Sequence, residues 1–341
     1  MDPSDKIGAS LQSAFEKQDF YEAHQIYKSI NFRLLRQKKY QQLADLLSEG
    51  CLTFLRLNLN QSGIDLARMY AEVLEKGNLP VTQEITGTIG RIYKAIPADL
   101  PNDRGLLLNL VTSWSQKRNP ETKAGHTAIH AEIARILFDE KNYELALYHA
   151  VRALDPASCL RTLQALKTSE DEKNHGREKD EHGDVEVPEE PADRKLLAIA
   201  VMEFLTLQKL DVAKRLFTLY ISEHPDAEVR TKLYNFRILA LLSALLSLCS
   251  KSGNATEEEY RPVQAAITEI FEPDQRVDKL LTRIGQIYLG IALPSSSGPL
   301  QGLLAGMFKK EAPSTSSSQD TLTSSADSKM KENLQADLDF D

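Results

Sequence analysis

The sequence is poor in cysteine and lacks long apolar runs. Cys51, Cys159 and Cys249 are the three cysteines in 341 residues, and no two of them have C-x-x-C spacing. This usage is typical of a reducing compartment, and it excludes a disulfide framework and a cysteine zinc site. The most apolar run, residues 238–249, is shorter than the roughly 20 residues that cross a bilayer, so it predicts a buried helix rather than membrane insertion. Residues 1–6 are polar and carry no signal-peptide pattern, and we expect a cytosolic protein.

Signatures of catalysis and of nucleotide binding are also missing. No G-x-x-x-x-G-K-[ST] loop, G-x-G-x-x-G turn or G-x-S-x-G elbow occurs in the sequence. His126 and His130 share one helix face, but no third zinc ligand accompanies them, so two surface or packed histidines are the better interpretation. His24 lies beside Tyr21 and Glu22 without any phosphate or metal cradle. We therefore expect no enzyme activity and no cofactor.

The charge balance disfavours nucleic acid as a ligand. The net charge is -8, whereas binding to a phosphate backbone depends on clustered Lys and Arg. One local basic cluster, formed by Arg33, Arg36, Lys38 and Lys39, could still meet an acidic protein partner. The sequence therefore predicts protein partners and no nucleic acid.

Apolar residues recur at helical spacing along the chain. Leu43, Leu46 and Leu47 show three- and four-residue spacing, and residues 66–74 and 85–93 repeat it. Alternating β-branched runs between hairpin turns do not occur, so no sheet is expected. Gly and Pro residues separate stretches of about 10 to 20 residues, which favours short connections between antiparallel helices. The pattern predicts an all-α protein.

A weak repeat indicates how the helices stack. An aromatic residue or Leu followed three residues later by a smaller apolar residue opens several helices, at residues 20–23, 40–43, 143–146 and 210–213. Tetratricopeptide-like arrays use such large–small alternation to let neighbouring helices approach closely. Because the copies are spaced unevenly, we predict an irregular α-solenoid of antiparallel helix pairs.

Composition divides the chain into four parts. Residues 1–167 and 195–310 form the two halves of the solenoid. Residues 168–194 are acidic and polar, and they predict a disordered insertion because they offer too little apolar surface to offset the entropy of ordering. Residues 311–341 are rich in Ser and Thr, and they predict a disordered tail.

Several segments resemble one known family. Residues 19–25, D-F-Y-E-A-H-Q, resemble the D-Y-Y-E-A-H-Q motif of the Golgi to ER traffic protein 4 family. Residues 61–66, Q-S-G-I-D-L, resemble its G-S-G-T-D-L, and residues 283–290, R-I-G-Q-I-Y-L-G, resemble its R-I-G-Q-L-F-F-G. These patches lie in the family's order within residues 7–308 and are strongest in the first 75 residues.

The resemblance implies an α-solenoid that acts as an adaptor in targeting tail-anchored proteins to the endoplasmic reticulum. In this family the N-terminal half docks the targeting ATPase of the Get pathway. The C-terminal half holds a ubiquitin-like adaptor protein, which connects to a chaperone. The acidic insertion and the Ser/Thr-rich tail depart from the family pattern, and no function is carried onto them.

The resemblance also implies contact residues. Arg33 and Asp65 are the first candidates for the ATPase, followed by Tyr21, Glu22, His24 and Gln25. We expect Arg33 and Asp65 to point away from the packed face, with Asp65 near a helix start, where its charge could also serve the helix dipole alone. Tyr21 and His24 could equally be packing residues.

The ubiquitin-like partner has its own candidates, Ile284, Tyr288 and Leu289. They are either core residues or part of an apolar groove for a partner helix, since both uses need the same residue types. An alternative function for the whole chain is a helical-repeat scaffold subunit of another large cytosolic complex.

Overall fold

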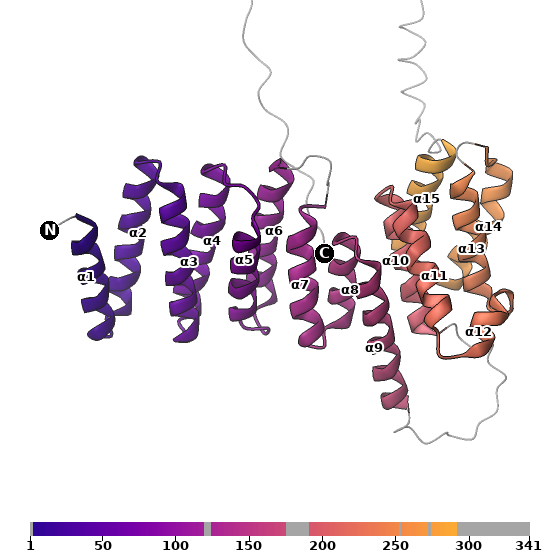
Figure 1. Cartoon of the computed structure of the whole chain (residues 1–341), viewed down its shortest axis with the longest axis horizontal. Coiled ribbons are helices and arrows are strands. Elements are labelled where there is room, and N and C mark those ends of the chain that lie inside the picture. The colour runs from indigo at the N-terminus through magenta and orange to yellow at the C-terminus, as the bar shows by residue number, and fades with distance from the viewer. Residues whose placement is uncertain (1–2, 119–123, 175–190, 252–253, 272–273, 292–341) are drawn as a thin grey trace, which may run out of the picture. The chain divides into compact units, whose positions relative to one another are not determined.

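The computed structural model describes residues 3–118, 124–174, 191–251, 254–271 and 274–291 (Figure 1). These residues form fifteen α-helices and one 3₁₀ helix, and none of them lies in a β-strand. The elements are α1 (Pro3–Glu16), α2 (Phe20–Arg36), α3 (Tyr40–Arg56), α4 (Asn60–Lys76), α5 (Gln83–Ala95), α6 (Pro101–Arg118), α7 (Thr127–Asp139), α8 (Tyr143–Arg152), α9 (Pro156–Asn174), α10 (Ala192–Thr206), α11 (Leu210–Glu223), α12 (Ala227–Thr231), η1 (Leu233–Asn235), α13 (Arg237–Ser250), α14 (Glu257–Phe271) and α15 (Gln275–Leu289).

Short turns join the helices, and many of these turns contain one residue with a positive φ. In the first four turns this residue is Gln18, Lys38, Asn58 or Asn78, with φ between 54° and 58°, so the turn recurs every 20 residues. Lys141, Leu154 and Gln208 have the same conformation in later turns, at uneven spacing. The solenoid is thus regular in its first helices and irregular beyond them.

Backbone hydrogen bonds hold these turns in place. The amide that follows the positive-φ residue donates to a carbonyl of the preceding helix, as from Lys39 to Leu34 at 3.0 Å and from Leu59 to Phe54 at 2.9 Å. This is the Schellman pattern, which satisfies carbonyls that a helix end would otherwise leave unpaired. The acceptor residues Ala14, Leu34, Phe54 and Leu74 are all buried. Each turn therefore starts the next helix with its apolar stripe facing the same core.

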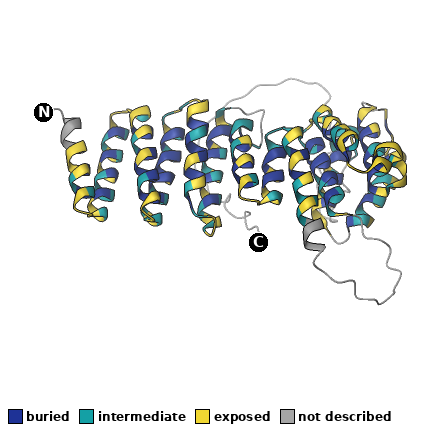
Figure 2. Ribbon diagram, turned by 60° about the horizontal axis from the view of Figure 1, so that its bottom comes forward, coloured by how far each residue is buried: buried dark blue, intermediate teal, exposed yellow. Residues whose placement is uncertain are grey.

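Helices pack mainly against their first or second neighbours along the chain. For example, α3 packs against α2, α4 and α5, and α4 packs against α2, α3 and α6. Buried residues lie on the faces between neighbouring helices, and exposed residues lie on the outer faces (Figure 2). Such packing of helix pairs is the architecture of an α-solenoid. The predicted all-α solenoid is confirmed.

The core consists of two apolar clusters that meet at the α7–α8 pair. The first cluster extends from Leu11 to Ala146, and the second contains Ala134 and residues from Leu147 to Ile284. On α8, the adjacent residues Ala146 and Leu147 belong to different clusters. The α7–α8 pair therefore joins the N-terminal helices to the C-terminal ones.

Helix α10 is the centre of the second cluster. It packs against α8, α9, α11, α13 and α15, and it is buried on most sides. Two buried acids on it have partners, as the cost of burying a charge requires. Asp193 accepts a hydrogen bond from the Tyr220 hydroxyl at 2.5 Å, and Glu203 pairs with Arg152 at 3.1 Å and also with Arg276. These pairs connect α10 to α11, α8 and α15.

The two ends of the segment predicted as an insertion, residues 168–194, lie in helices. Helix α9 continues to Asn174, and α10 begins at Ala192. Polar residues can extend the end of a helix without burying apolar surface, and the buried Asp193 has its partner in Tyr220, 27 residues along the chain. Residues 175–190 and the predicted tail at 311–341 lie outside the described residues, as does the C-terminal half after Ile291.

Among the described residues, no helix has both the length and the apolar character that crossing a membrane requires. The apolar run at residues 238–249 lies in α13, where seven side chains are buried in the second cluster. The prediction of a buried helix there is confirmed.

The turn geometry makes a prediction about Lys38, which has a φ of 57°. A side chain in this conformation costs about 1 kcal/mol, which glycine avoids, so Lys38→Gly should raise the free energy of unfolding by about 0.5 kcal/mol or more. Gln37 precedes it with an ordinary φ of -82°. Gln37→Gly should therefore lower the free energy of unfolding by about 0.5–1 kcal/mol. Urea unfolding of both variants measures these changes. If both substitutions raised, or both lowered, the free energy of unfolding, the account of the turn would be contradicted.

Candidate protein-binding site

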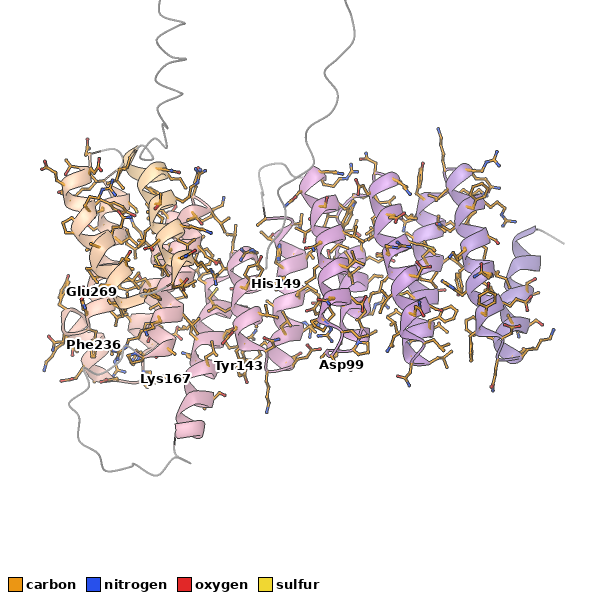
Figure 3. All side chains as sticks on the ribbon, turned by 180° about the vertical axis from the view of Figure 1, so that it is seen from behind. Asp99, Tyr143, His149, Lys167, Phe236 and Glu269 are labelled. Carbon is orange, nitrogen blue, oxygen red and sulfur yellow. The ribbon has the colours of Figure 1, made fainter. Side chains whose placement is uncertain are left out.

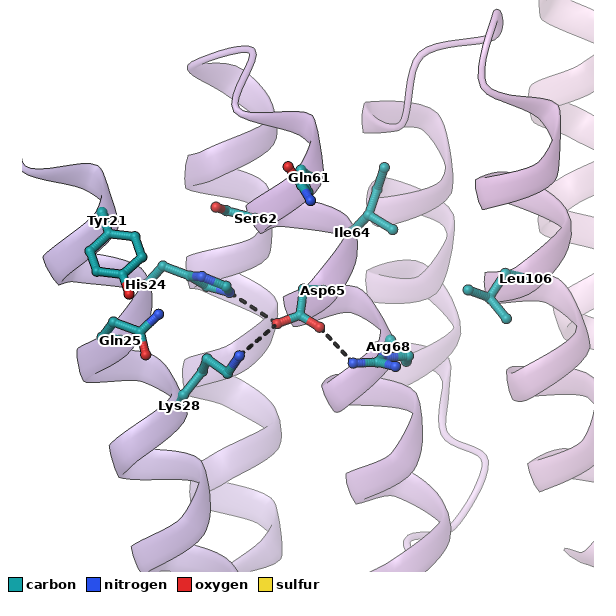
Figure 4. A pocket seen from close by; sticks show the side chains of 10 residues that line it. All are labelled: Tyr21, His24, Gln25, Lys28, Gln61, Ser62, Ile64, Asp65, Arg68 and Leu106. Atoms are coloured by element: carbon teal, nitrogen blue, oxygen red, sulfur yellow. Dashed lines mark hydrogen bonds and ion pairs between the residues drawn. The ribbon is translucent and has the colours of Figure 1, made fainter.

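A groove of about 600 Å³ lies between α2, α4 and α6 (Figure 4). It brings together four of the six residues predicted to contact the ATPase, although they come from helices far apart in the sequence. Its lining residues are Tyr21, His24, Gln25 and Lys28 of α2, Gln61, Ser62, Ile64, Asp65 and Arg68 of α4, and Leu106 of α6.

Three basic side chains surround the carboxylate of Asp65. Its Oδ2 is 3.0 Å from His24 Nε2 and 3.9 Å from Lys28 Nζ, and its Oδ1 is 2.7 Å from Arg68 Nη2 (Figure 4). Lys28 and Arg68 are 46% and 52% exposed, whereas Asp65 is 20% exposed. The expected position of Asp65 at a helix start is wrong, because α4 begins at Asn60 and Asp65 lies in its second turn. Ion pairs, not the first-turn dipole, hold this carboxylate.

His24 links α2 to α4 through this carboxylate. Because a carboxylate oxygen only accepts, the Nε2 of His24 carries the proton of the 3.0 Å hydrogen bond. The imidazole also packs against the ring of Phe54, with the ring centres 6.0 Å apart. His24 is therefore both a packing residue and a part of the groove, which combines the two interpretations that the sequence left open.

Two glycines bring the helices close enough for this contact. A Cβ on Gly50 of α3 would lie 2.5 Å from Cζ of the buried Tyr27 on α2. A Cβ on Gly63 of α4 would lie 2.6 Å from Cγ of Leu55 on α3. No real Cβ contact is so short, so α2 and α4 can approach α3 this closely only because these positions lack side chains. Gly50 and Gly63 thus position the groove.

The remaining two predicted contact residues, Glu22 and Arg33, line a second groove of about 360 Å³ between α1 and α2. Gln25 borders both grooves. Arg33 is half-buried rather than fully exposed, and its Nε is buried without a hydrogen-bond partner among the described residues. The six candidates therefore line two neighbouring grooves that share α2, instead of one.

The C-terminal part of α2 and the turn after it are uniformly basic. Every ionisable side chain in residues 28–39 is a Lys or Arg, and Arg33, Arg36, Lys38 and Lys39 form no ion pair with any residue that the structure describes. Phe32 is 66% exposed in the same segment, with the Arg36 guanidinium 5.7 Å from its ring centre. An exposed aromatic residue among unpaired cations is a typical composition for a protein contact.

The three residues predicted for the ubiquitin-like partner lie on α15. Ile284 is fully buried in the second apolar cluster, whereas Tyr288 and Leu289 pack against the edge of that cluster and stay partly exposed. Burial raises the pKa of Tyr288 to about 12, so its hydroxyl keeps its proton. Of these three residues, only Tyr288 and Leu289 have exposed surface that a partner could contact.

The histidines considered as metal ligands have other roles. His126 caps α7 by accepting a hydrogen bond from the amide of Ala128, and the buried His130 lies 2.8 Å from His149, Nδ1 to Nδ1. His130 Nε2 donates to the carbonyl of Ala124, so its Nδ1 is the acceptor and His149 Nδ1 carries the shared proton. No group of three metal-binding side chains occurs among the described residues.

The sequence analysis missed Lys28, Arg68 and Leu106. Two of them had a usable signal, because Lys28 follows His24 by four residues and Arg68 follows Asp65 by three, the spacings at which side chains meet on a helix. Leu106 lies outside every segment that resembles the family. Only the tertiary packing of α6 against α4 brings it to the groove.

Comparison with known proteins extends this description. The sequence pattern of the family described as Golgi to ER traffic protein 4 matches residues 37–308, which is most of the chain. The chain belongs to this family. The Golgi to ER traffic protein 4 homologs of Oryzias latipes and of Homo sapiens are each 27% identical over 311 residues; these alignments cover 89% of this chain and 86% and 85% of the relatives.

The fold of the Golgi to ER traffic protein 4 family agrees as well. The crystal structure of C. therm. Get4 has a TM-score of 0.61 at 20% identity and covers 90% of this chain and 96% of its own. The resemblance seen in the sequence is thus confirmed. Residues 19–25 lie before the range that the family pattern matches. The groove geometry on α2 is therefore an observation separate from that match.

The close packing at Gly63 makes a prediction about stability. Gly63→Ala places a methyl group against Leu55 and should lower the free energy of unfolding by about 1–3 kcal/mol. Gly87 of α5 has nothing within 4 Å of its Cβ position. Gly87→Ala should therefore raise the free energy of unfolding by about 0.5–1 kcal/mol. Thermal melts would contradict the packing argument if both variants gained stability.

The His130–His149 pair makes a prediction about pH. Burial lowers the pKa of both, that of His149 to about 3, from the usual 6.5. Below pH 6.5 the unfolded chain takes up protons that the folded pair does not, so stability present above that pH is lost as the pH falls. His149 alone should account for about 2 kcal/mol between pH 7 and pH 5.

Urea unfolding at these two pH values tests this. His149→Gln should lose less stability on acidification than the wild type, even though it starts lower at pH 7. His126→Gln, at the N-cap of α7, is the matched control and should keep the wild-type loss. An identical loss in His149→Gln and the wild type would show that the pair does not titrate as described.

Proposed function

We propose that the chain is a non-enzymatic adaptor in the cytosolic targeting and insertion of tail-anchored proteins into the membrane of the endoplasmic reticulum. In this role it bridges the targeting ATPase of the Get pathway and a ubiquitin-like adaptor protein with its chaperone. Membership of the Golgi to ER traffic protein 4 family supports a role in this traffic. It argues against the alternative of a scaffold subunit in an unrelated complex.

The observation that carries the ATPase site is the groove around Asp65. Tyr21, His24, Gln25 and Asp65 converge in it from two helices, although only motif resemblance linked them in the sequence. Tyr21 is 76% exposed at its edge. An exposed aromatic residue beside ordered charges is the composition in which a few residues supply most of the binding energy.

Charge distribution supports rapid docking at this end. The chain carries a net charge of -8, yet residues 28–39 contain only basic ionisable side chains. Such local charge steers a complementary partner and makes association fast and sensitive to salt. The proposal therefore includes an ATPase surface with acids facing the end of α2.

The chemistry of the cysteines supports a non-enzymatic role. Burial raises the pKa of Cys51 and of Cys249 to about 12, and it also raises that of Cys159. The thiolate is the nucleophilic form, so these side chains stay unreactive at neutral pH.

The C-terminal helices are proposed to hold the ubiquitin-like partner through an apolar surface that includes Tyr288 and Leu289. Both residues border the second cluster and stay partly exposed. An apolar surface of this kind gives binding that salt weakens little.

Charge reversal tests the ATPase site. Arg33→Glu and Asp65→Lys should each weaken ATPase binding by on the order of several kcal/mol, because attraction across the interface becomes repulsion. Asp65→Lys also adds a third cation beside Lys28 and Arg68. Both variants should stay folded, since Lys28 and Arg68 are about half exposed and ion pairs with such side chains contribute about 0–1 kcal/mol each. A binding titration at two salt concentrations and a thermal melt measure both effects.

The matched control is Arg215→Glu, an exposed reversal on α11 that should leave ATPase binding unchanged. Unchanged affinity and an unchanged melt in Arg33→Glu and Asp65→Lys would remove these residues from the site. Weakened affinity together with a collapsed melt would show that they are structural.

A further inference from the structure

A third groove, of about 470 Å³, lies between α6 and α8 and is bordered by the residue that follows α10. Leu108 and Asn109 of α6, Tyr148 and Arg152 of α8, and Leu207 line it. We call it the central groove. It lies on a different side of α6 from the groove around Asp65, which is the groove that Leu106 lines. It lies apart from the residues proposed for the ATPase and for the ubiquitin-like partner.

Arg152 gives the central groove a positive charge. It is the only Lys, Arg, Asp or Glu among the lining residues. Its acidic partner, Glu203, is shared with Arg276 on α15, so one carboxylate faces two guanidinium groups. Burial lowers the pKa of His130 and His149 in the lining, so they are neutral at pH 7. The group as a whole keeps one uncompensated positive charge.

The hydrogen bonds of Arg152 leave part of its guanidinium open. Nη1 donates to both the Tyr148 carbonyl and Glu203, at 3.0 and 3.1 Å. Nε and Nη2 have no partner among the described residues. A guanidinium edge with free N–H groups is a good match for a carboxylate, which can accept two of them at once.

Apolar surface accompanies this charge. The ring of Tyr148 is 40% exposed, and the Arg152 guanidinium packs over it, 3.3 Å from its centre. Leu145, one turn earlier on α8, is 48% exposed. His149, labelled in Figure 3, uses its Nδ1 proton for His130, so its Nε2 is an acceptor. The central groove thus combines a cation, an aromatic surface and an acceptor for an N–H group.

We propose that the central groove binds a segment of a partner protein in which an acidic side chain lies next to an apolar one. The acid pairs with Arg152, the apolar side chain covers Tyr148, and a backbone N–H of the segment reaches His149. The charge of the lining excludes a basic segment, and a single cation is too little for a nucleic-acid backbone. The volume is within the range of pockets that bind small groups and short segments.

Calorimetric titration of the full chain with four synthetic peptides tests this. Each has twelve residues and blocked ends. The first carries Asp and Leu in a Gly/Ser background, and the others replace Asp by Lys, Asp by Asn, or Leu by Ser. The Asp/Leu peptide should bind at least tenfold more tightly than the Lys/Leu peptide, and more tightly than the other two.

Two tryptophan variants on α6 locate the site. Asn109→Trp fills the central groove and should weaken binding of the Asp/Leu peptide at least fivefold. Asn102→Trp, an equally exposed position that lines no described groove, should leave the affinity unchanged, and melts should show both variants folded. Tyr148→Ser should weaken binding as Asn109→Trp does. Equal affinity for the Asp and Lys peptides, no binding of the Asp/Leu peptide, or unchanged affinity in both groove variants would overturn the proposal.

Discussion

The tight turn between successive helices is the constraint on which the rest of the molecule depends. In each of the first four turns, one residue takes the left-handed conformation and the next amide bonds back to a buried position of the preceding helix. This geometry returns the chain antiparallel and keeps the apolar stripe on the core side. Because α2 then packs against α4 as well as α3, residues about 40 positions apart in the sequence come into contact. The pairing of His24 with Asp65 is one such contact.

The buried face and the exposed face of these helices have different roles. Close packing at Gly50 and Gly63 fixes the spacing of α2, α3 and α4 from inside. The exposed edges of α2 and α4 carry charged side chains. Ion pairs hold these side chains in place and neutralise only part of their charge. The same division recurs at α8 and α10, where the buried Glu203 holds Arg152 from the inner side while the outer edge of Arg152 stays open. The solenoid supplies rigid positions, and the surfaces between its helices supply the chemistry of binding.

The sequence predicted the class of fold because apolar periodicity and short connections depend on local residues alone. It also predicted that Asp65 and His24 belong to one functional region, but only through resemblance to a family. Periodicity could not reveal that Lys28 and Arg68 enclose Asp65, nor that Leu106 joins them, since these depend on how three helices pack. The 20-residue recurrence was missed because its marker is a backbone conformation taken by Gln, Lys and Asn rather than by glycine. The start of α10 was predicted a few residues too late for a related reason: Asp193 resembles a surface charge until Tyr220 is placed beside it.

The central claim is that the N-terminal helices form the surface that docks the targeting ATPase. Hydrogen–deuterium exchange of the full chain, with and without a saturating amount of that ATPase, tests it most directly, because amide protection reports local contact and ordering at each segment. The account predicts added protection in α2 and α4, at Phe20–Arg36 and Asn60–Lys76, and little change in α11 to α14. Added protection confined to α10–α15, with α2 and α4 unchanged, would contradict it.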